Sequence, residues 1–207
     1  MTQVFSYDEN QAAAADAGGG EYITESCVVR GFVEQAKWTE ANSGAKGLEL
    51  SFESEHGQKA NYLTIYYQKK DGSKNEVGVN QIQSLMGVTG VQSLSQQGGQ
   101  NGMIAPELTR KPVQIALERE NYTKSNGGEG FRFQIKCFMS ARSGKTIAEH
   151  LEGKSADSAA YWEQRFAENP GGKQAKQQQS QPYNSANEYA NSNIPPSSND
   201  FDDEIPF

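Results

Sequence analysis

Hydrophobic and polar positions alternate over five stretches of the chain, and this pattern predicts five strands. Leu48, Leu50 and Phe52, for example, occupy every second position of residues 47–55, with polar side chains between them. A period of two places one set of side chains on the buried face of a strand. The predicted strands span residues 21–40, 47–55, 60–70, 111–122 and 130–141.

The same alternation predicts which side chains of the last two strands face inward. The inward set of these two strands is Val113, Ile115, Leu117, Phe131, Phe133, Ile135 and Cys137. The opposite face of the fifth strand then carries Arg132, Lys136 and Phe138.

Two stretches change to helical spacing. Ile82, Leu85 and Met86 recur at the period of a helix, which predicts a short helix over residues 80–86. A second helix is expected over residues 156–168, packed on the strands and ended by a Pro-Gly-Gly sequence. Residues 92–102, rich in Ser, Gln and Gly, are expected to form a flexible loop.

The order of these elements predicts the fold class. Three strands, a short helix and two further strands follow the order of an OB fold, a mainly β, five-stranded barrel with short helices. An SH3-like barrel or a small sandwich stays open as an alternative, because the number of strands alone does not fix the topology.

Composition divides the chain into four parts. Residues 1–20 end in Ala-rich and Gly-rich sequence and are expected to be a flexible arm, while residues 21–170 form the folded body. Residues 171–199 consist largely of Gln, Ser, Asn and Pro, which bury little apolar surface, and are expected to be a disordered linker. Residues 200–207 form an acidic tip.

The charge distribution limits how the body could bind a polyanion. The chain carries a formal net charge of −7, of which −3 falls in residues 171–207. The remaining residues still hold 21 acidic against 17 basic side chains. Any nucleic-acid binding must therefore rest on local basic patches and aromatic stacking, because the global charge does not supply it.

The cysteines and the N-terminal sequence favour a cytoplasmic protein. Cys27 and Cys137 each lie in a predicted strand and are expected to be buried free thiols, since nothing else marks the chain as secreted. Residues 1–6 lack the basic and apolar regions of a signal peptide, and no apolar stretch is long enough to span a membrane. The oligomeric state is not fixed by the sequence, and a homo-oligomer stays open.

Candidate catalytic and metal sites are weak. The sequence Ser143-Gly144-Lys145-Thr146 resembles the end of a phosphate-binding loop, but Met139 stands where the first glycine belongs, so a β-turn is expected. The two histidines, His56 and His150, have no metal-ligand spacing with the cysteines. We expect no enzymatic activity, no metal and no cofactor.

Aromatic and basic residues outside the predicted core suit single-stranded nucleic acid. Unstacked bases need flat aromatic surfaces and phosphates need cations, with each stacked base worth about 1–3 kcal/mol. Packing between strands or beneath the second helix is an equally good explanation for the tyrosines. The candidate contacts are Arg30, Phe32, Trp38, Tyr62, Tyr66, Lys70, Arg119, Tyr122, Lys124, Arg132, Lys136, Phe138 and Arg142.

The last eight residues are the most specific feature of the chain. They contain four carboxylates, no cation, and an apolar end with the chain's α-carboxylate beside it. A purely solubilising tail would have no use for this apolar end, whereas a tethered peptide could insert it into a partner's pocket while the carboxylates meet basic rims. The eight are Asp200, Phe201, Asp202, Asp203, Glu204, Ile205, Pro206 and Phe207.

This tip resembles the acidic C-terminal tip of bacterial single-stranded DNA-binding proteins, whose pattern is Asp-Phe-Asp-Asp-Asp-Ile-Pro-Phe. The single departure, Glu204, keeps the charge. The order of body, linker and tip also follows that family. The match covers only a small part of the chain, and the interrupted meander of the body is more similar to the single-stranded DNA-binding proteins of bacteriophages.

The resemblance implies a body that coats and protects single-stranded DNA without sequence preference, in the host cytoplasm if a phage encodes it. It also implies that Phe207 enters an apolar pocket of replication, recombination and repair proteins, with the acidic residues along a basic groove. Two alternatives stay open: a recombination mediator or annealing protein with the same tip, and a protein adaptor that does not bind DNA.

Overall fold

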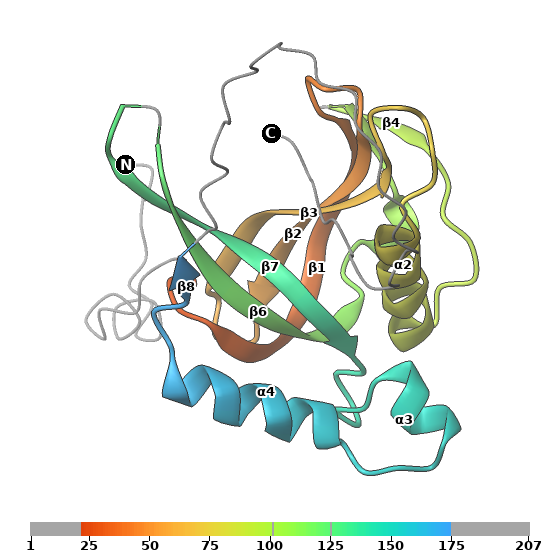
Figure 1. Ribbon diagram of the computed structural model, residues 1–207. Coiled ribbons are helices and arrows are strands. Elements are labelled where there is room, and N and C mark those ends of the chain that lie inside the picture. Colours follow the sequence, from red (N-terminus) through yellow and green to blue (C-terminus); the bar gives the residue numbers. More distant parts are fainter. Residues whose placement is uncertain (1–21, 101, 125, 175–207) are drawn as a thin grey trace, which may run out of the picture.

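The computed structural model describes residues 22–174, apart from residues 101 and 125, and this part of the chain is mainly β (Figure 1). An antiparallel meander of three strands comes first, as predicted. Its members are β1 (Cys27–Glu40), β2 (Lys46–Ser54) and β3 (Lys59–Gln68). The predicted bounds of these strands differ mainly at the start of β1, which was expected at residue 21.

Strand β1 is the centre of the sheet because it pairs along both edges. Its first half pairs with β6 (Pro112–Thr123) through residues 27–32, and residues 31–40 pair with β2. Strand β6 forms a long antiparallel hairpin with β7 (Glu129–Met139), which extends away from the helices in the lower part of Figure 1. The order along this part of the sheet is therefore β3-β2-β1-β6-β7.

Three short strands complete a sheet of eight strands within the described residues. Strand β4 (Gln97–Gly99) and strand β5 (Gly102–Ile104) form a small hairpin against β1, in the stretch expected to be a loop. Strand β8 (Lys173–Gln174) pairs with β6 in parallel, although the sequence assigns residues 171–199 to the linker.

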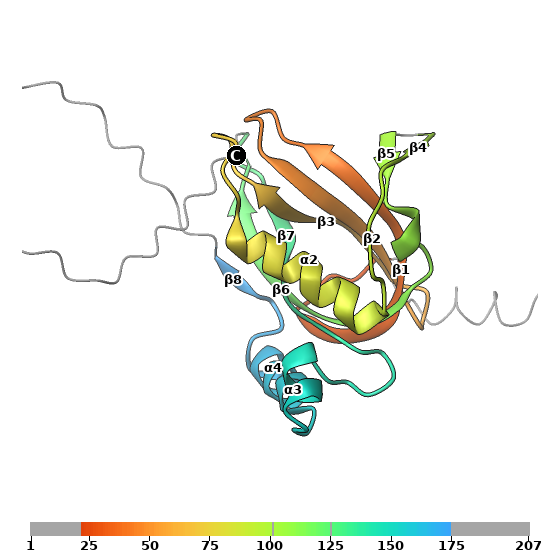
Figure 2. The same cartoon turned by 90° about the vertical axis from the view of Figure 1, so that its right-hand side faces the viewer.

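The sheet is open, and its two edge strands in this order, β3 and β7, approach each other without pairing in the described residues. Helix α2 (Glu76–Thr89) covers the core at this point. No ladder joins β3 to β7 in the described part of the chain. Helix α2 contacts both strands and also β6, and Figure 2 shows it lying across the sheet. The mainly β prediction is confirmed, while closure into an OB barrel stays a prediction. The helix is longer than the predicted residues 80–86.

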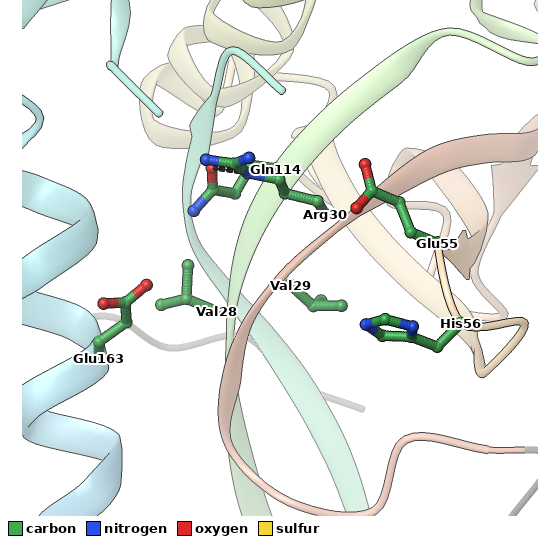
Figure 3. Close-up of a pocket in the computed structure, with 7 residues that line it drawn as sticks. All are labelled: Val28, Val29, Arg30, Glu55, His56, Gln114 and Glu163. Carbon is green, nitrogen blue, oxygen red and sulfur yellow. Dashed lines mark hydrogen bonds between the residues drawn. The ribbon is translucent and has the colours of Figure 1, made fainter. Parts of the chain in front are cut away.

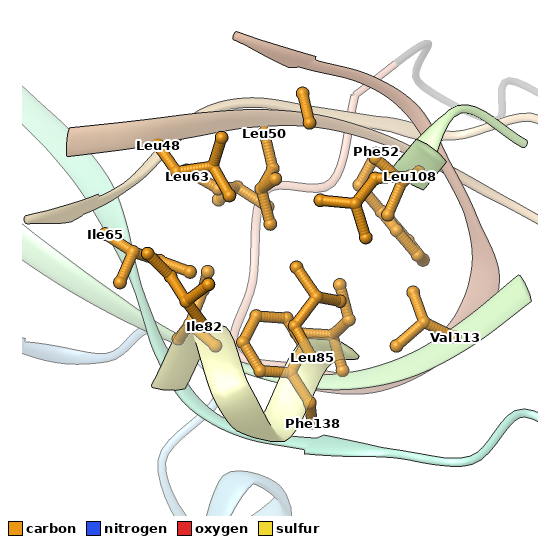
Figure 4. Close-up of a cluster of buried hydrophobic side chains, with 14 of the residues drawn as sticks. Leu48, Leu50, Phe52, Leu63, Ile65, Ile82, Leu85, Leu108, Val113 and Phe138 are labelled. Carbon is orange, nitrogen blue, oxygen red and sulfur yellow. The ribbon is translucent and has the colours of Figure 1, made fainter. Parts of the chain in front are cut away.

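The core lies inside the curved sheet and beneath α2 (Figure 4). Leu48, Leu50 and Phe52 of β2 are fully buried there, as the alternating pattern predicts. Leu85 of α2 and Leu108 of a 3-10 turn (Pro106–Leu108) are buried in the same cluster. Burial of such side chains is worth about 1.5–3 kcal/mol each, and this stabilises the curved sheet.

One side chain of β7 faces the opposite way from the prediction. Phe138 was expected outside the core, but it is only 1 % exposed and belongs to the main cluster. The ladder pairs Ala116 with Cys137 and Leu117 with Ile135, so a β-bulge at Lys136 adds one residue to β7. A bulge of one residue reverses the alternation beyond it, which turns Phe138 inward.

A second apolar cluster lies between the outer face of the sheet and helix α4 (Asp157–Glu168). Ala159 and Phe166 of α4 are buried against Ala116 and Met139, with Cys137 and Trp162 partly buried beside them. The predicted packing of this helix is confirmed, although Tyr161, also expected to pack, is 53 % exposed. Cys137 therefore faces α4, whereas the prediction placed it in the inner core.

The loop before α4 contains the short helix α3 (Ile147–Leu151), which the hydrophobic pattern did not predict. Thr146 and Glu149 begin it with a reciprocal capping box. The preceding turn covers residues 141–143, with the Gly144 amide donating to the Ser140 carbonyl at 2.8 Å and the Ser140 amide donating to the Lys145 carbonyl at 2.9 Å. A turn is therefore present, but it begins earlier than the β-turn expected over residues 143–146 and its hydrogen bond joins residues four apart.

Both cysteines are free, as predicted. Cys27 and Cys137 lie in different apolar clusters and are partly buried. Burial, together with the nearby Glu25, raises the pKa of Cys27 to about 11. Burial, together with Glu149, likewise raises the pKa of Cys137 to about 11. Both side chains are therefore neutral thiols at physiological pH.

Candidate nucleic-acid interface

Beyond Leu117, where β1 no longer pairs with β6, the β6–β7 hairpin carries an aromatic surface with a cation stacked on it. The Cζ atom of Arg119 lies 4.2 Å from the ring centroid of Phe131. Phe133 meets Phe131 edge to face, with the ring centroids 5.6 Å apart. Phe131 is 38 % exposed because the hairpin extends past the core at this level. An exposed ring beside a guanidinium is suited to stacking an unpaired base and contacting its phosphate.

Hydrogen bonds hold the guanidinium of Arg119 in place. Its Nε donates to Oδ1 of Asn121 at 2.8 Å, and its Nη1 donates to the carbonyl of Thr24 at 2.7 Å. No carboxylate forms an ion pair with Arg119 in the described residues. The charge is therefore oriented without being neutralised, which leaves it available to a polyanion.

The other face of the same hairpin presents Tyr122 and Lys124. Tyr122 pairs across the ladder with Gly130, and both side chains lie over that glycine. A Cβ atom at Gly130 would come within 2.9 Å of Cζ of Tyr122 and 3.0 Å of Cε of Lys124. Tyr122 is 38 % exposed, so the hairpin end offers an aromatic ring and a basic residue on each face.

Two predicted cations of β7 point outward but are paired with buried carboxylates of β6. Nε of Arg132 lies 2.6 Å from Oε2 of Glu120, and Nζ of Lys136 lies 3.4 Å from Oε2 of Glu118. Both glutamates are buried, with exposures of 8 % for Glu118 and 6 % for Glu120. Buried carboxylates need such partners, so these cations serve the fold first.

A third cation, Lys173, reaches the carboxylate of Glu118. Nζ of Lys173 in β8 lies 2.8 Å from Oε2 of Glu118. Burial tends to raise the pKa of Glu118, but Lys173 and Lys136 outweigh it and hold that pKa below its ordinary value. The outer face of the hairpin near α4 is consequently a compact network of alternating charge.

The predicted residues of β3 lie on another part of the surface. Tyr62 is 80 % exposed and has a φ of +61°, beside a β-bulge opposite Ser51. Tyr66 is half-buried, and Lys70 is exposed in the turn after the strand. A bulged strand that turns a large aromatic ring fully to solvent is a feature associated with binding surfaces.

The predicted aromatic residues of β1 have partners inside the protein. Phe32 lies beneath Arg110, whose Cζ is 3.5 Å from the ring centroid. Trp38 packs against the core, and its Nε1 donates to the carbonyl of Ser95 at 2.9 Å. Trp38 also meets Tyr67 edge to face. These contacts account for both rings without a ligand.

Arg30 lines a pocket of about 320 Å³ between β1, the turn after β2 and helix α4 (Figure 3). Its Nε donates to Oε1 of Gln114 at 3.1 Å. The turn after β2 and helix α4 supply Glu55 and Glu163 to the same pocket. Two carboxylates beside one guanidinium disfavour a polyanion, so we do not include this pocket in the interface.

The predicted contacts therefore do not form one surface. Five of them, Arg119, Tyr122, Lys124, Arg132 and Lys136, lie along the β6–β7 hairpin, and Tyr62, Tyr66 and Lys70 follow β3. Arg142 is exposed in the turn after β7, and Phe138 is in the core. The tip, Asp200 to Phe207, lies outside the described residues.

Phe131, Phe133 and Asn121 are the residues of this surface that the sequence patterns missed. The alternating pattern predicts that both phenylalanines lie on the inward face of β7, and they do lie on that face. Only the length of the hairpin beyond the reach of β1, which pairs with β6 no further than Leu117, could have indicated that Phe131 is exposed and Phe133 only partly buried.

No protein-family model and no curated protein sequence matches this chain. Within residues 22–174, as far as they are described, no helix is long and apolar enough to cross a membrane. In the same residues no three acidic, histidine or cysteine side chains are grouped so that they could hold a metal ion.

Proposed function

We propose that this protein binds single-stranded DNA without sequence preference and brings replication, recombination and repair proteins to it through residues 200–207. The observation that carries the proposal is the sequence Asp-Phe-Asp-Asp-Glu-Ile-Pro-Phe at these positions. It resembles the tip of bacterial single-stranded DNA-binding proteins at every position except Glu204, where the charge is kept.

The arrangement of the body supports an OB-related fold. The strand order β3-β2-β1-β6-β7, with α2 between β3 and β6 in the sequence, is the order that an OB barrel requires. Helix α2 contacts both β3 and β7, the two strands whose pairing would close such a barrel. OB folds bind single strands with exposed strand faces and loops, which agrees with the proposed activity.

The β6–β7 hairpin is the binding surface that this proposal favours. Phe131 and Tyr122 offer rings on its two faces, and Arg119 and Lys124 lie beside them without a carboxylate partner in the described residues. The basic and aromatic side chains are concentrated on this one surface, which would let a body of net negative charge bind DNA. A protein of this function needs no cofactor and would act in the cytoplasm, in that of the bacterial host if a phage encodes it.

A protein adaptor that does not bind DNA is the second candidate, and a specific observation favours it. Arg132, Lys136 and Lys173 are paired with Glu118 and Glu120, so much of the basic charge near the hairpin is already neutralised. An adaptor would use the same tip for one partner and the exposed aromatic residues for another.

Titration of the full chain with fluorescent oligo-dT, at several lengths and salt concentrations, distinguishes the two candidates. The proposal expects tight binding that strengthens with oligonucleotide length and weakens with salt. Mass measurement of the complex gives the number of chains bound at each length. Binding no tighter than micromolar at low salt would contradict DNA coating and favour the adaptor.

A further inference from the structure

The segment that follows α4 is bound to β6 by a specific set of contacts. Lys173 and Gln174 of β8 pair in parallel with Glu120 and Asn121, which places β8 along the edge of β6 (Figure 1). The carbonyl of Pro170 accepts a hydrogen bond of 2.8 Å from the amide of Ser26. The chain from residue 170 to residue 174 is therefore part of the fold.

Gly172 is required by the closeness of this approach. Its φ is +77°, and a Cβ atom there would lie 2.0 Å from the carbonyl oxygen of Arg119. No other residue fits that space without displacing the backbone of β6 or of the segment. The neighbouring Gly171 differs, because a Cβ atom there would meet nothing within 4 Å.

The side chain of Lys173 fastens the segment to the outer face of the hairpin. Its Nζ forms the ion pair with Glu118 and also donates to Oε1 of Gln134 at 3.3 Å. Lys173 and Gln174 are nevertheless exposed, and the ladder is only two residues long. A contact this small can open without unfolding the sheet.

Asn121 connects this segment to the candidate DNA-binding surface. Its Nδ2 donates to the carbonyl of Gly171 at 2.9 Å, while its Oδ1 accepts from Nε of Arg119 at 2.8 Å. Arg119 in turn stacks on Phe131. The side chain of Asn121 thus contacts both the bound segment and the guanidinium that is stacked on the exposed ring of Phe131.

The edge of β6 that holds this segment has no other strand partner in the described part of the chain. Strand β1 pairs with β6 only as far as Leu117, and β8 takes over at Glu120. Residues 175–207, with the proposed partner-binding tip at their end, follow β8 directly in the sequence. A force on the tail acts first on this short ladder.

We propose that residues 170–174 form a releasable latch that couples the tail to the DNA-binding surface of the hairpin. When a partner protein bound to residues 200–207 pulls on the tail, β8 leaves β6 and Asn121 loses its bond to Gly171. Arg119 is then less well held against Phe131, and the hairpin releases its DNA to the partner. The latch itself is a property of the fold, whereas the coupling rests on the proposed function.

Gly172→Ala opens the latch, and Gly171→Ala is the matched control. Trypsin cleavage after Lys173, followed by mass spectrometry, reports the open state. We expect cleavage of the full-length Gly172→Ala chain to be about tenfold faster than that of the wild type, with Gly171→Ala unchanged. Amide hydrogen exchange of residues 172–174 compares the opening of the latch in the same three proteins. The melting temperature of each variant shows that it is folded. Equal protection of Lys173 in all three proteins would overturn the latch.

The coupling is tested with the same proteins and oligo-dT. We expect Gly172→Ala to weaken oligo-dT binding roughly three- to tenfold. In an Asn121→Ala background the same substitution should weaken binding less, because the connection through Asn121 is already broken. An open latch with unchanged oligo-dT affinity would overturn the coupling. Absence of DNA binding by the wild type would contradict both the proposed function and the coupling, while the cleavage rates would still decide whether the latch exists.

Discussion

The guanidinium of Arg119 lies over the ring of Phe131, with 4.2 Å between Cζ and the ring centroid, on a hairpin that extends beyond the core. The ring is 38 % exposed although the alternation of β7 places it on the inward face. This combination of an oriented cation and a ring open to solvent makes the hairpin the strongest candidate for base stacking.

Phe131→Ala is therefore expected to weaken oligo-dT binding with little change in melting temperature. Loss of one stacked base costs about 1–3 kcal/mol, which corresponds to roughly 5- to 150-fold in affinity. Fluorescence titration measures the effect, and Phe131→Trp should keep most of the affinity. Tyr161→Ala is the matched control, because Tyr161 is also exposed but lies on α4. Equal affinity of both alanine variants would move the site away from the hairpin.

Phe138→Ala is expected to affect stability. Phe138 is 1 % exposed among the side chains of the main cluster. Truncation of a buried phenylalanine costs about 3–5 kcal/mol, since it removes buried apolar surface and leaves a cavity. Urea unfolding followed by tryptophan fluorescence measures this loss. An unchanged unfolding midpoint would contradict the inward orientation that the bulge at Lys136 produces.

The difference between these two phenylalanines shows where the sequence pattern is sufficient and where it is not. Alternation correctly identifies the buried face of β2, because Leu48, Leu50 and Phe52 keep one register along the strand. It fails at Phe138, since a bulge inserts one residue and is visible only when the partner strand is placed. Local periodicity contains no information about such an insertion.

The ion pairs of the hairpin could have been predicted in part. Glu118 has the parity opposite to Val113, Ile115 and Leu117, so the pattern already places it on the same outward face as Lys136. Lys173 could not have been foreseen, because it lies in a stretch of linker-like composition and reaches Glu118 only through β8. Contacts between segments this far apart depend on tertiary structure.

Lys124→Ala and Lys136→Ala should separate DNA contact from structural pairing. Lys124 has no carboxylate partner in the described residues, whereas Lys136 is paired with Glu118. For single strands, each phosphate contact contributes about 0.7 to the slope of log affinity against log salt. We expect Lys124→Ala to lower this slope by about that amount and Lys136→Ala to leave it unchanged. A larger change of slope for Lys136→Ala would return the β7 face to the binding surface.

The ion pairs of Glu118 make part of the stability dependent on pH. Although burial raises its pKa, Lys173 and Lys136 hold the pKa in the folded protein below the ordinary 4.5. A depressed pKa means that the unfolded chain binds the proton more readily. The stabilisation is therefore complete above pH 4.5 and is lost as the pH falls through the folded-state pKa.

Glu118→Gln tests this dependence by urea unfolding over the acidic range. We expect the variant to be less stable than the wild type by roughly 1–3 kcal/mol near neutral pH, because Lys136 and Lys173 lose a charged partner. The difference should shrink on acidification below pH 4.5, as the wild-type carboxylate becomes protonated. A difference that is constant over the whole range would mean that Glu118 contributes through packing alone.

Deletion of residues 200–207 should separate recruitment from DNA binding. We expect the deletion to abolish capture of replication, recombination and repair proteins from a bacterial lysate, as identified by mass spectrometry. The apolar end and the carboxylates together form the recognised peptide. Phe207→Ala should have the same effect, because it empties the partner's pocket. A tail with residues 200–207 in scrambled order is the control for charge, and it should also fail.

Oligo-dT affinity of the deleted chain should be unchanged or higher, because four carboxylates have been removed. Loss of DNA affinity in the deletion, or partner capture by the scrambled tail, would contradict a tethered recognition peptide. Capture by charge alone would instead show that the acidic residues act as an unspecific polyanion. The order of the eight residues, beyond their charge, is thus the property that decides whether the tip recruits.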